Sequence, residues 1–463
     1  MRGGKLRTRV AHAVQRPAED SLTELTHIFG ILCLISAPVW ATLLLFPNSY
    51  YGPGTAVLTF PAVIIASALV TSRVAKGNQF LREVMLVGMA IRFVSTAVFL
   101  QVYFRVWDGG DLLGYYEHTG DIFHEFYRTG IFTPQLPFAR QSLVVDVAGV
   151  ISIFTGWSLP GLCIIFSFFA FLGEILFFKA FCLSFPKINT RLPAMFFFML
   201  PSLLFWTSFL SKDSIIFLFI GLSFYAFVQM QVTGVRWAPL CVLSLVPITL
   251  IRPHIGGMIA IAYMAAFLFT TRKKGYVVLA AKLVLAPLLL AGAVYLVHNA
   301  AQFVQADSID EGVTRLQTLH KGLQTGGSAT GSASMSKGLA LIPVMAFRPL
   351  FWEVHNPQMA VSCIEGCFLF YGFWMRKKGI FLAFRNARNS PALIAATVFC
   401  LEFSIIFSIG MGNVGTLVRE RAMMLPFWFF IVYSVERAKR QPQSYVAVRR
   451  LRAVREMALA RNV

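Results

Sequence analysis

Long apolar stretches recur along the chain, with short polar connections between them. A helix that crosses a membrane needs roughly 20 mostly apolar residues. The pattern predicts an all-α fold, a polytopic bundle of about twelve transmembrane helices. The expected spans lie at 28–46, 56–72, 83–104, 158–181, 192–210, 213–232, 236–251, 254–271, 276–297, 357–375, 391–410 and 423–436.

A further stretch from Gln141 to Trp157 is borderline, because it is short and carries Asp146. Cytoplasmic loops are rich in Lys and Arg, and this bias decides the case. If 141–157 crossed the membrane, the basic loops after it would all face outward. We therefore expect an interfacial or re-entrant segment there, and both termini in the cytoplasm. The basic loops are those at 73–82, 187–191, 272–274 and 376–388.

Composition supports a membrane protein without a sizeable soluble domain. The chain is 57% hydrophobic and 13% charged, whereas a soluble protein has about 25% charged residues. Much of the net charge of +20 lies at the two ends, which is typical of cytoplasmic flanks and requires no nucleic-acid partner. We expect one membrane domain over 1–436 and a basic amphipathic tail over 437–463 that lies on anionic lipid.

The predicted topology collects unusual polar motifs on the non-cytoplasmic face, which also holds two long loops at 105–157 and 298–356. The first loop carries Asp108-Gly109-Gly110-Asp111, followed by aromatic residues at helical spacing. Carboxylates on a tight turn at a membrane surface suit general-base chemistry on an interfacial substrate. The alternative is a polar loop capped by Asp before an interfacial helix.

Two short motifs interrupt apolar stretches on the same face. Lys212 and Asp213 lie where burial is unfavourable unless the charges pair or bind a ligand. Arg252 and His254 flank a helix-breaking proline, and a guanidinium there suits a phosphate oxygen. The alternatives are a polar hairpin for the first motif and an arginine that reaches lipid headgroups for the second.

Two more motifs lie near the end of the chain. Arg348, Trp352, Glu353 and His355 cluster just before a span, a richer combination than an interfacial aromatic belt requires. Arg419 and Arg421 precede the last span on the outer face, where an anionic ligand would explain them. Four further ionisable residues lie within spans and could line a groove or form structural pairs: Arg92, Glu174, Glu365 and Glu402.

These motifs resemble known proteins over roughly residues 100–430. The acidic loop after an early span resembles the first periplasmic loop of GT-C glycosyltransferases, which use lipid-phosphate donors. The patterns PSLLFWTSFLSKDS, FRPLFWEVHN and NVGTLVRERAMMLPF resemble bacterial multispanning proteins of surface-polysaccharide assembly.

The resemblance implies an enzyme of the bacterial inner membrane, a glycosyltransferase or polysaccharide polymerase. Its partners would be a polyprenyl-(di)phosphate-linked sugar or oligosaccharide, a glycan acceptor, membrane lipids and other polysaccharide-assembly proteins. In GT-C enzymes an aspartate of this loop acts as base or binds metal, and the resemblance assigns that role to Asp111 or Asp108. No second metal-ligand motif accompanies them, so a divalent metal stays open and no other cofactor is expected. The expected substrate-binding residues are Lys212, Asp213, Arg252, His254, Arg348, Trp352, Glu353, His355, Arg419 and Arg421.

Two alternatives remain open. A twelve-span transporter or lipid-linked-sugar flippase would keep its key charges at the bilayer midplane, where Arg92, Glu174 and Glu402 are candidates. No repeat relates the two halves of the chain, which disfavours this alternative. An acyltransferase that modifies the polysaccharide would rest on His118 and Asp121 alone.

Overall fold

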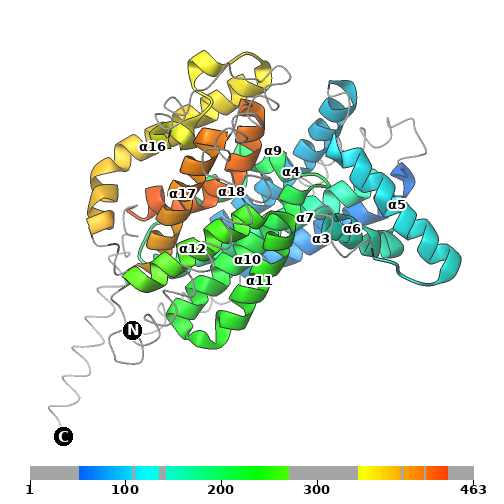
Figure 1. Ribbon diagram of the computed structural model, residues 1–463, viewed down its shortest axis with the longest axis horizontal. Helices are drawn as coiled ribbons and strands as arrows, with labels where there is room; N and C mark the ends of the chain where they lie inside the picture. The colour runs from blue at the N-terminus through cyan, green and yellow to red at the C-terminus, as the bar shows by residue number, and fades with distance from the viewer. Residues whose placement is uncertain are drawn as a thin grey trace, which may run out of the picture.

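The computed structural model describes residues 52–106, 110–134, 142–270, 342–385, 387, 390–410 and 413–435. In these ranges the regular elements are α-helices and short 3-10 helices, without a β-strand (Figure 1). The all-α prediction is therefore confirmed for the described residues. The expected spans 28–46 and 276–297, residues 298–341 of the second long loop and the tail 437–463 lie outside them.

The elements follow one another as α3 (Pro53–Ala75), α4 (Gln79–Arg105), α5 (Asp111–Thr129), α6 (Ser142–Thr155), α7 (Leu159–Ser184), α8 (Arg191–Met199), α9 (Pro201–Trp206), α10 (Lys212–Thr233), η2 (Val235–Trp237), α11 (Ala238–Ile251), α12 (Pro253–Phe269), η3 (Ile342–Phe347), η4 (Phe351–Glu353), α16 (Pro357–Arg385), α17 (Pro391–Gly410) and α18 (Val414–Tyr433).

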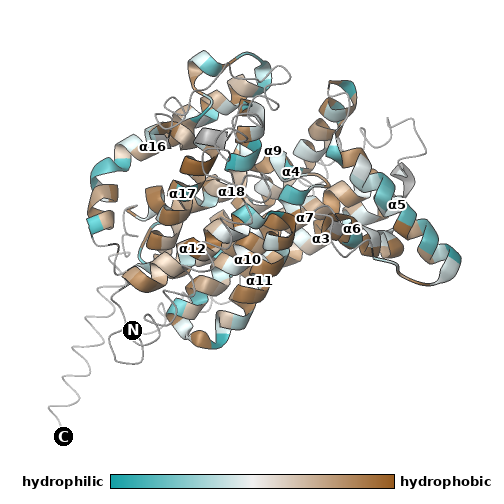
Figure 2. Ribbon diagram, viewed as in Figure 1, coloured by the Kyte–Doolittle hydropathy of each residue, from teal (hydrophilic) through white to brown (hydrophobic). Residues whose placement is uncertain are grey.

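Five of the described helices are long and apolar enough to cross a membrane by length and composition: α3, α4, α7, α10 and α17. Twelve full-length spans are therefore not seen in the described ranges. The apolar helices α11 and α12 have 14 and 17 residues, since Pro253 starts a new helix directly after Arg252. Figure 2 shows the apolar character of the central helices against the polar surface of α5.

The expected span 192–210 is broken, and this corrects the sequence prediction. Pro201 starts α9 after the nine-residue α8, because proline fits the first turn of a helix but not its interior. From Thr207 to Ser211 the chain is irregular until α10 begins. Backbone polar groups at membrane depth must be satisfied within the protein. Arg92 does this here, because its Nη1 donates to the Thr207 carbonyl oxygen at 3.3 Å.

Arg92 is itself held by a buried counter-charge. Its Nη2 lies 2.5 Å from Glu174 Oε1, and both side chains are almost wholly buried. Its Nη1 also donates to the Thr207 hydroxyl at 3.0 Å. The two intra-span charges therefore form a structural pair between α4 and α7 that fixes the broken segment before α10.

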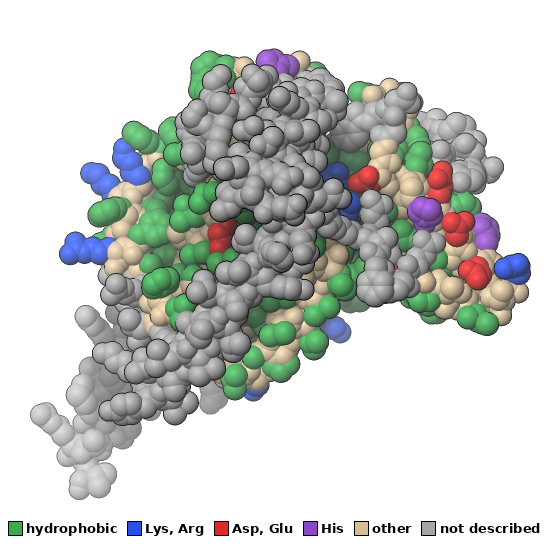
Figure 3. Space-filling view, viewed as in Figure 1, with side chains coloured by type: hydrophobic (Ala, Val, Ile, Leu, Met, Phe, Trp, Pro, Cys, Tyr) green, Lys and Arg blue, Asp and Glu red, His purple; other side chains and the backbone are tan. Residues whose placement is uncertain are grey.

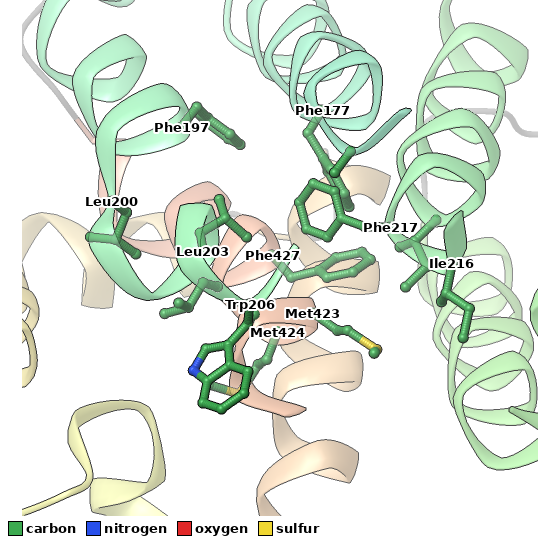
Figure 4. Close-up of a cluster of buried hydrophobic side chains, with 14 of the residues drawn as sticks. Phe177, Phe197, Leu200, Leu203, Trp206, Ile216, Phe217, Met423, Met424 and Phe427 are labelled. Carbon is green, nitrogen blue, oxygen red and sulfur yellow. The ribbon is translucent and has the colours of Figure 1, made fainter. Parts of the chain in front are cut away.

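Helices α7 and α10 approach each other closely at two glycines. A β-carbon on Gly221 would lie 2.5 Å from the Gly173 carbonyl oxygen. Small residues let helix backbones meet in this way, and close packing is a main source of helix association in membranes. The aromatic core lies beside this contact: Phe177 packs 5.5 Å from Phe217 and 5.3 Å from Phe427 between ring centroids (Figure 4).

The acidic stretch forms α5, which pairs with α6. Trp157, just after α6, stacks on Tyr116 at 4.5 Å between ring centroids and donates its indole N–H to the Tyr116 carbonyl oxygen. With 14 residues α6 is shorter than the roughly 20 that a crossing needs. Its interfacial or re-entrant placement stays a prediction.

We predict that Gly221→Ala destabilises the protein, because the new methyl group meets backbone rather than a movable side chain. Overpacking of this kind costs about 1–3 kcal/mol. Thermal unfolding of the purified protein in detergent measures it. The control is Gly114→Ala in α5, where a β-carbon meets nothing within 4 Å in the part of the chain that the structure describes. Equal melting temperatures for the two variants would contradict the close contact.

Candidate functional site

Polar residues from four parts of the chain meet at one end of the bundle. They come from the start of α5, the start of α10, the junction of α11 and α12, and the first two turns of α18. We call this group the charged cluster, and its members are Asp111, Lys212, Asp213, Arg252, Arg419 and Glu420. The sequence motifs from distant segments, expected to share one face, thus converge in the structure.

Local sequence explains each position. The Ser211 side chain caps α10 by accepting the Ser214 N–H at 3.2 Å, which places Asp213 in the first helical turn. A carboxylate is favourable there because the first backbone N–H groups lack partners. Asn413 caps α18 in the same way, at 2.8 Å from the Gly415 nitrogen.

Asp213 lies at the centre of the charged cluster. Its side chain is 1% exposed, and its two oxygens take separate arginines. Arg252 Nη2 lies 2.6 Å from Oδ1, and Arg419 Nε donates to Oδ2. Burial of an unpaired carboxylate would be strongly unfavourable. The two guanidinium groups offset this cost because they pair with both carboxylate oxygens.

Arg252 bridges Asp213 and a second carboxylate. Its Nη1 donates to Glu420, so one guanidinium joins α10, the α11–α12 junction and α18. Burial lowers the pKa of Arg252, but the nearby Asp213 and Glu420 carboxylates outweigh burial and hold this pKa above its ordinary value. Arg252 therefore stays charged at every working pH.

The edge of the charged cluster is more open to solvent. The Asp111 side chain is 49% exposed and the Lys212 side chain 19%, with Lys212 Nζ 3.8 Å from Asp111 Oδ2. The Tyr115 hydroxyl lies 3.5 Å from the same oxygen. Burial raises the pKa of Tyr115, so its hydroxyl stays protonated and keeps a hydrogen to donate.

Tyr103 fixes the turn before Asp111. Its hydroxyl donates to the Gly110 carbonyl oxygen at 2.9 Å and accepts the Leu113 N–H at 3.4 Å. A β-carbon on Gly110 would lie 3.2 Å from the Tyr103 ring, so a side chain would crowd this contact. The start of α5 is thereby anchored to α4 with Asp111 in its first turn.

A second polar group joins η3, η4, α9, α16 and α18. Arg348 pairs with Glu353, its Nε lying 3.0 and 3.1 Å from the two oxygens. Glu353 also accepts the Leu350 N–H at 2.8 Å. Arg421 is wholly buried and pairs with Glu365 at 2.7 Å. These four residues are paired within the protein, whereas Trp352 and His355 are exposed.

The expected site residues therefore fall into three sets. Five of them belong to the charged cluster, namely Asp111, Lys212, Asp213, Arg252 and Arg419, and His254 is exposed two residues after Arg252, 6.1 Å from Phe407 between ring centroids. Arg348, Glu353 and Arg421 belong to the second polar group. Asp108 lies outside the described residues. None of these assignments as substrate-binding or catalytic is tested by the geometry, and they stay predictions.

Two members of the site were missed from the sequence. Glu420 lies between Arg419 and Arg421 in the chain and supplies the second carboxylate for Arg252. Tyr115 stands one helical turn after Asp111, on the same face of α5. The spacing of four residues signalled Tyr115, but only the fold brings Glu420 to a partner 168 residues away in the chain.

Other chemistry on this end of the bundle is sparse. Figure 3 shows acidic and histidine side chains gathered over α5 on the visible face. His118 Nδ1 lies 3.5 Å from Asp121 Oδ2, and both side chains are mostly exposed. Among the described residues, no three His, Cys, Asp or Glu side chains form a group that could hold a metal ion.

Comparison with protein families, with curated proteins and with solved structures finds no match for this chain.

We predict that Asp213→Asn destabilises the fold, because Arg252 and Arg419 would lose the carboxylate that lies between them. Breaking a buried pair by removing one partner costs about 3–5 kcal/mol. Thermal unfolding in detergent measures this loss. The matched control is Asp121→Asn in α5, the same change on a side chain that is 72% exposed. A melting temperature as high as that of the control would show that the pairing does not stabilise the protein.

Proposed function

We propose that this protein is a bacterial inner-membrane glycosyltransferase or polysaccharide polymerase. Its donor would be a sugar or oligosaccharide on a polyprenyl (di)phosphate, and its acceptor a glycan hydroxyl. The proposal includes a GT-C-like arrangement of about twelve spans with both termini in the cytoplasm. It rests on the sequence resemblance over roughly residues 100–430, together with the charged cluster.

One observation carries the proposal. A half-exposed carboxylate, Asp111, lies 3.8 Å from the Lys212 ammonium, and the neighbouring Asp213 binds two arginines of the same cluster. A glycosyl transfer from a lipid phosphate needs a base for the acceptor and cations for the leaving group. Both kinds of group meet at this end of the bundle.

In the proposed reaction, the bond between the sugar and the donor phosphate breaks while a bond to the acceptor oxygen forms. The acceptor hydroxyl proton passes to the Asp111 carboxylate. Lys212 and Arg419 stabilise the negative charge of the leaving (di)phosphate. They are the cluster cations whose side chains are partly exposed, at 19% and 23%. Asp213 and Glu420 hold Arg252 and Arg419 in place, since each carboxylate binds a guanidinium.

The structure also bears on the transporter alternative. A flippase would use charged groups near the bilayer midplane, yet Arg92 and Glu174 are fully engaged with each other and with the Thr207–Ser208 segment. Glu402 in α17 is the other such candidate, and its Oε2 has no hydrogen-bond partner among the described residues. Substitution of Asp111 and of Glu402 therefore separates the two functions.

We predict that Asp111→Asn abolishes polysaccharide production, while Glu402→Gln retains it. Loss of a general base typically lowers the rate by about 10²–10⁴-fold. Complementation of a deletion strain measures the polymer, and thermal unfolding verifies that both variants fold. Asp121→Asn on the same helix is the matched control. Loss of product in Glu402→Gln with normal product in Asp111→Asn would favour the transporter. Assays of membranes with and without a chelator would show whether a divalent metal contributes.

We also predict that the candidate site faces away from the cytoplasm. Cysteines introduced singly at Asp111, Asn356 and Thr416, in a background without native cysteines, should react with an impermeant maleimide added to intact spheroplasts. A cysteine at Lys187, in the loop between α7 and α8, should react only after the membrane is opened. Labelling of Asp111 from the cytoplasmic side alone would overturn the proposed topology.

A further inference from the structure

We propose that Arg421 is a positioning residue, whose ion pair with Glu365 fixes the start of α18 so that Arg419 and Glu420 reach the charged cluster. Arg421 was expected from the sequence to hold phosphate, but its side chain is 0% exposed. The activity part of this inference rests on the proposed function, while its structural part does not.

The contacts of Arg421 tie α18 to three other elements. Its Nη2 lies 2.7 Å from Glu365 Oε1 in α16. Its Nη1 donates to the carbonyl oxygens of Ala346, at 3.2 Å, and of Arg348. One guanidinium therefore binds α16, η3 and the connection that follows η3, and it supplies hydrogen-bond donors to two backbone carbonyl groups.

Glu365, the partner of Arg421, also binds the start of α9. Its Oε2 accepts the Ser202 N–H at 2.7 Å, and its Oε1 accepts the Ser202 hydroxyl at 2.6 Å. The neighbouring Gly366 lets the η3 backbone lie close, because a β-carbon there would be 2.2 Å from the Phe347 carbonyl oxygen. The elements α9, α16, η3 and α18 thus meet at one buried ion pair.

The helical geometry of α18 links this pair to the charged cluster. Arg419, Glu420 and Arg421 occupy one turn, and successive side chains point about 100° apart. Arg419 and Glu420 contact residues of α10 and of the α11–α12 junction. Arg421 contacts α16 and η3 instead. A shift of α18 away from η3 would therefore move Arg419 and Glu420 with it.

A structural role alone would give a different experimental result from a positioning role. Removal of Arg421 leaves Glu365 buried and unpaired, so the single variant loses stability in either case. Replacement of both charges by apolar side chains of similar volume often restores stability. The double variant, however, lacks the guanidinium that binds the Ala346 and Arg348 carbonyl oxygens and the carboxylate that binds Ser202. If the double variant regains stability while α18 is displaced, the effect of Arg421 on the placement of α18 is distinguished from its effect on stability.

The test compares Arg421→Met, the double variant Arg421→Met with Glu365→Met, and the control Arg376→Met. Arg376 lies 4.9 Å from the Tyr433 ring centroid and so packs α16 against the other end of α18. Farnesyl diphosphate is the binding probe, titrated into the detergent-purified protein, and melting temperature is measured in parallel. Spin labels on cysteines at Thr416 and Trp352, in a background without native cysteines, report the distance between α18 and η4.

We expect the single variant to melt earlier and the double variant to recover most of the melting temperature. The double variant should still bind farnesyl diphosphate roughly tenfold or more weakly, because small displacements of charged groups weaken a polar site strongly. Its spin-label distance distribution should broaden or shift, while Arg376→Met should leave both readouts unchanged. Wild-type affinity and an unchanged distribution in the double variant would overturn the positioning role.

Failure of the proposed function is distinguishable from failure of this inference. If wild-type protein does not bind farnesyl diphosphate, the lipid-phosphate function is in question, and the distance distribution alone then decides the positioning role. A broadened distribution in the double variant would support it without any ligand. An unchanged one would overturn it.

Discussion

The structure depends on the pairing of charges that the bundle buries. Asp213 is nearly inaccessible, yet two arginines from segments far apart in the chain satisfy its two oxygens. An isolated carboxylate in such a position would be strongly unfavourable, and so would an isolated guanidinium. The start of α10, the α11–α12 junction and the start of α18 must therefore assemble together. Apolar side chains pack around this contact, but their packing does not by itself specify which segments meet.

The same principle explains how helices can break inside the bundle. Arg92 and Glu174 pair beside the irregular segment Thr207–Ser211, where the guanidinium binds the Thr207 carbonyl oxygen. Arg421 and Glu365 pair beside η3, with the guanidinium again on carbonyl oxygens and the carboxylate on the start of α9. In each case the ion pair supplies partners that a continuous helix would have supplied to its own backbone. The first break leads into α10, whose start carries Lys212 and Asp213, and the second pair binds α18, which carries Arg419 and Glu420. The two buried pairs are thereby related to the candidate site.

The sequence revealed the helical class and the unusual polar motifs, because apolar periodicity and misplaced charges are local properties. The convergence of Lys212, Asp213, Arg252 and Arg419 agrees with the expectation of a shared face. The broken span at 192–210 was missed because composition does not show that Pro201 begins a new helix or that Arg92 satisfies the gap. The separation of Arg419 from Arg421 was also missed. Two residues in one turn look alike in sequence, and only the packing of α18 directs one to Asp213 and the other to Glu365.

The balance of charge in the cluster constrains the proposed reaction. Lys212, Arg252 and Arg419 face Asp111, Asp213 and Glu420, so the cluster has no surplus positive charge for a phosphate. Asp213 and Glu420 are buried carboxylates paired with arginines, whereas Asp111 is half exposed and lies 3.8 Å from Lys212, beyond hydrogen-bond distance. An arriving phosphate would therefore bind Lys212 in place of Asp111, and the buried pairs would stay intact. Loss of the ammonium contact would leave the Asp111 carboxylate available for the acceptor proton. Donor binding and activation of the base would then be one event.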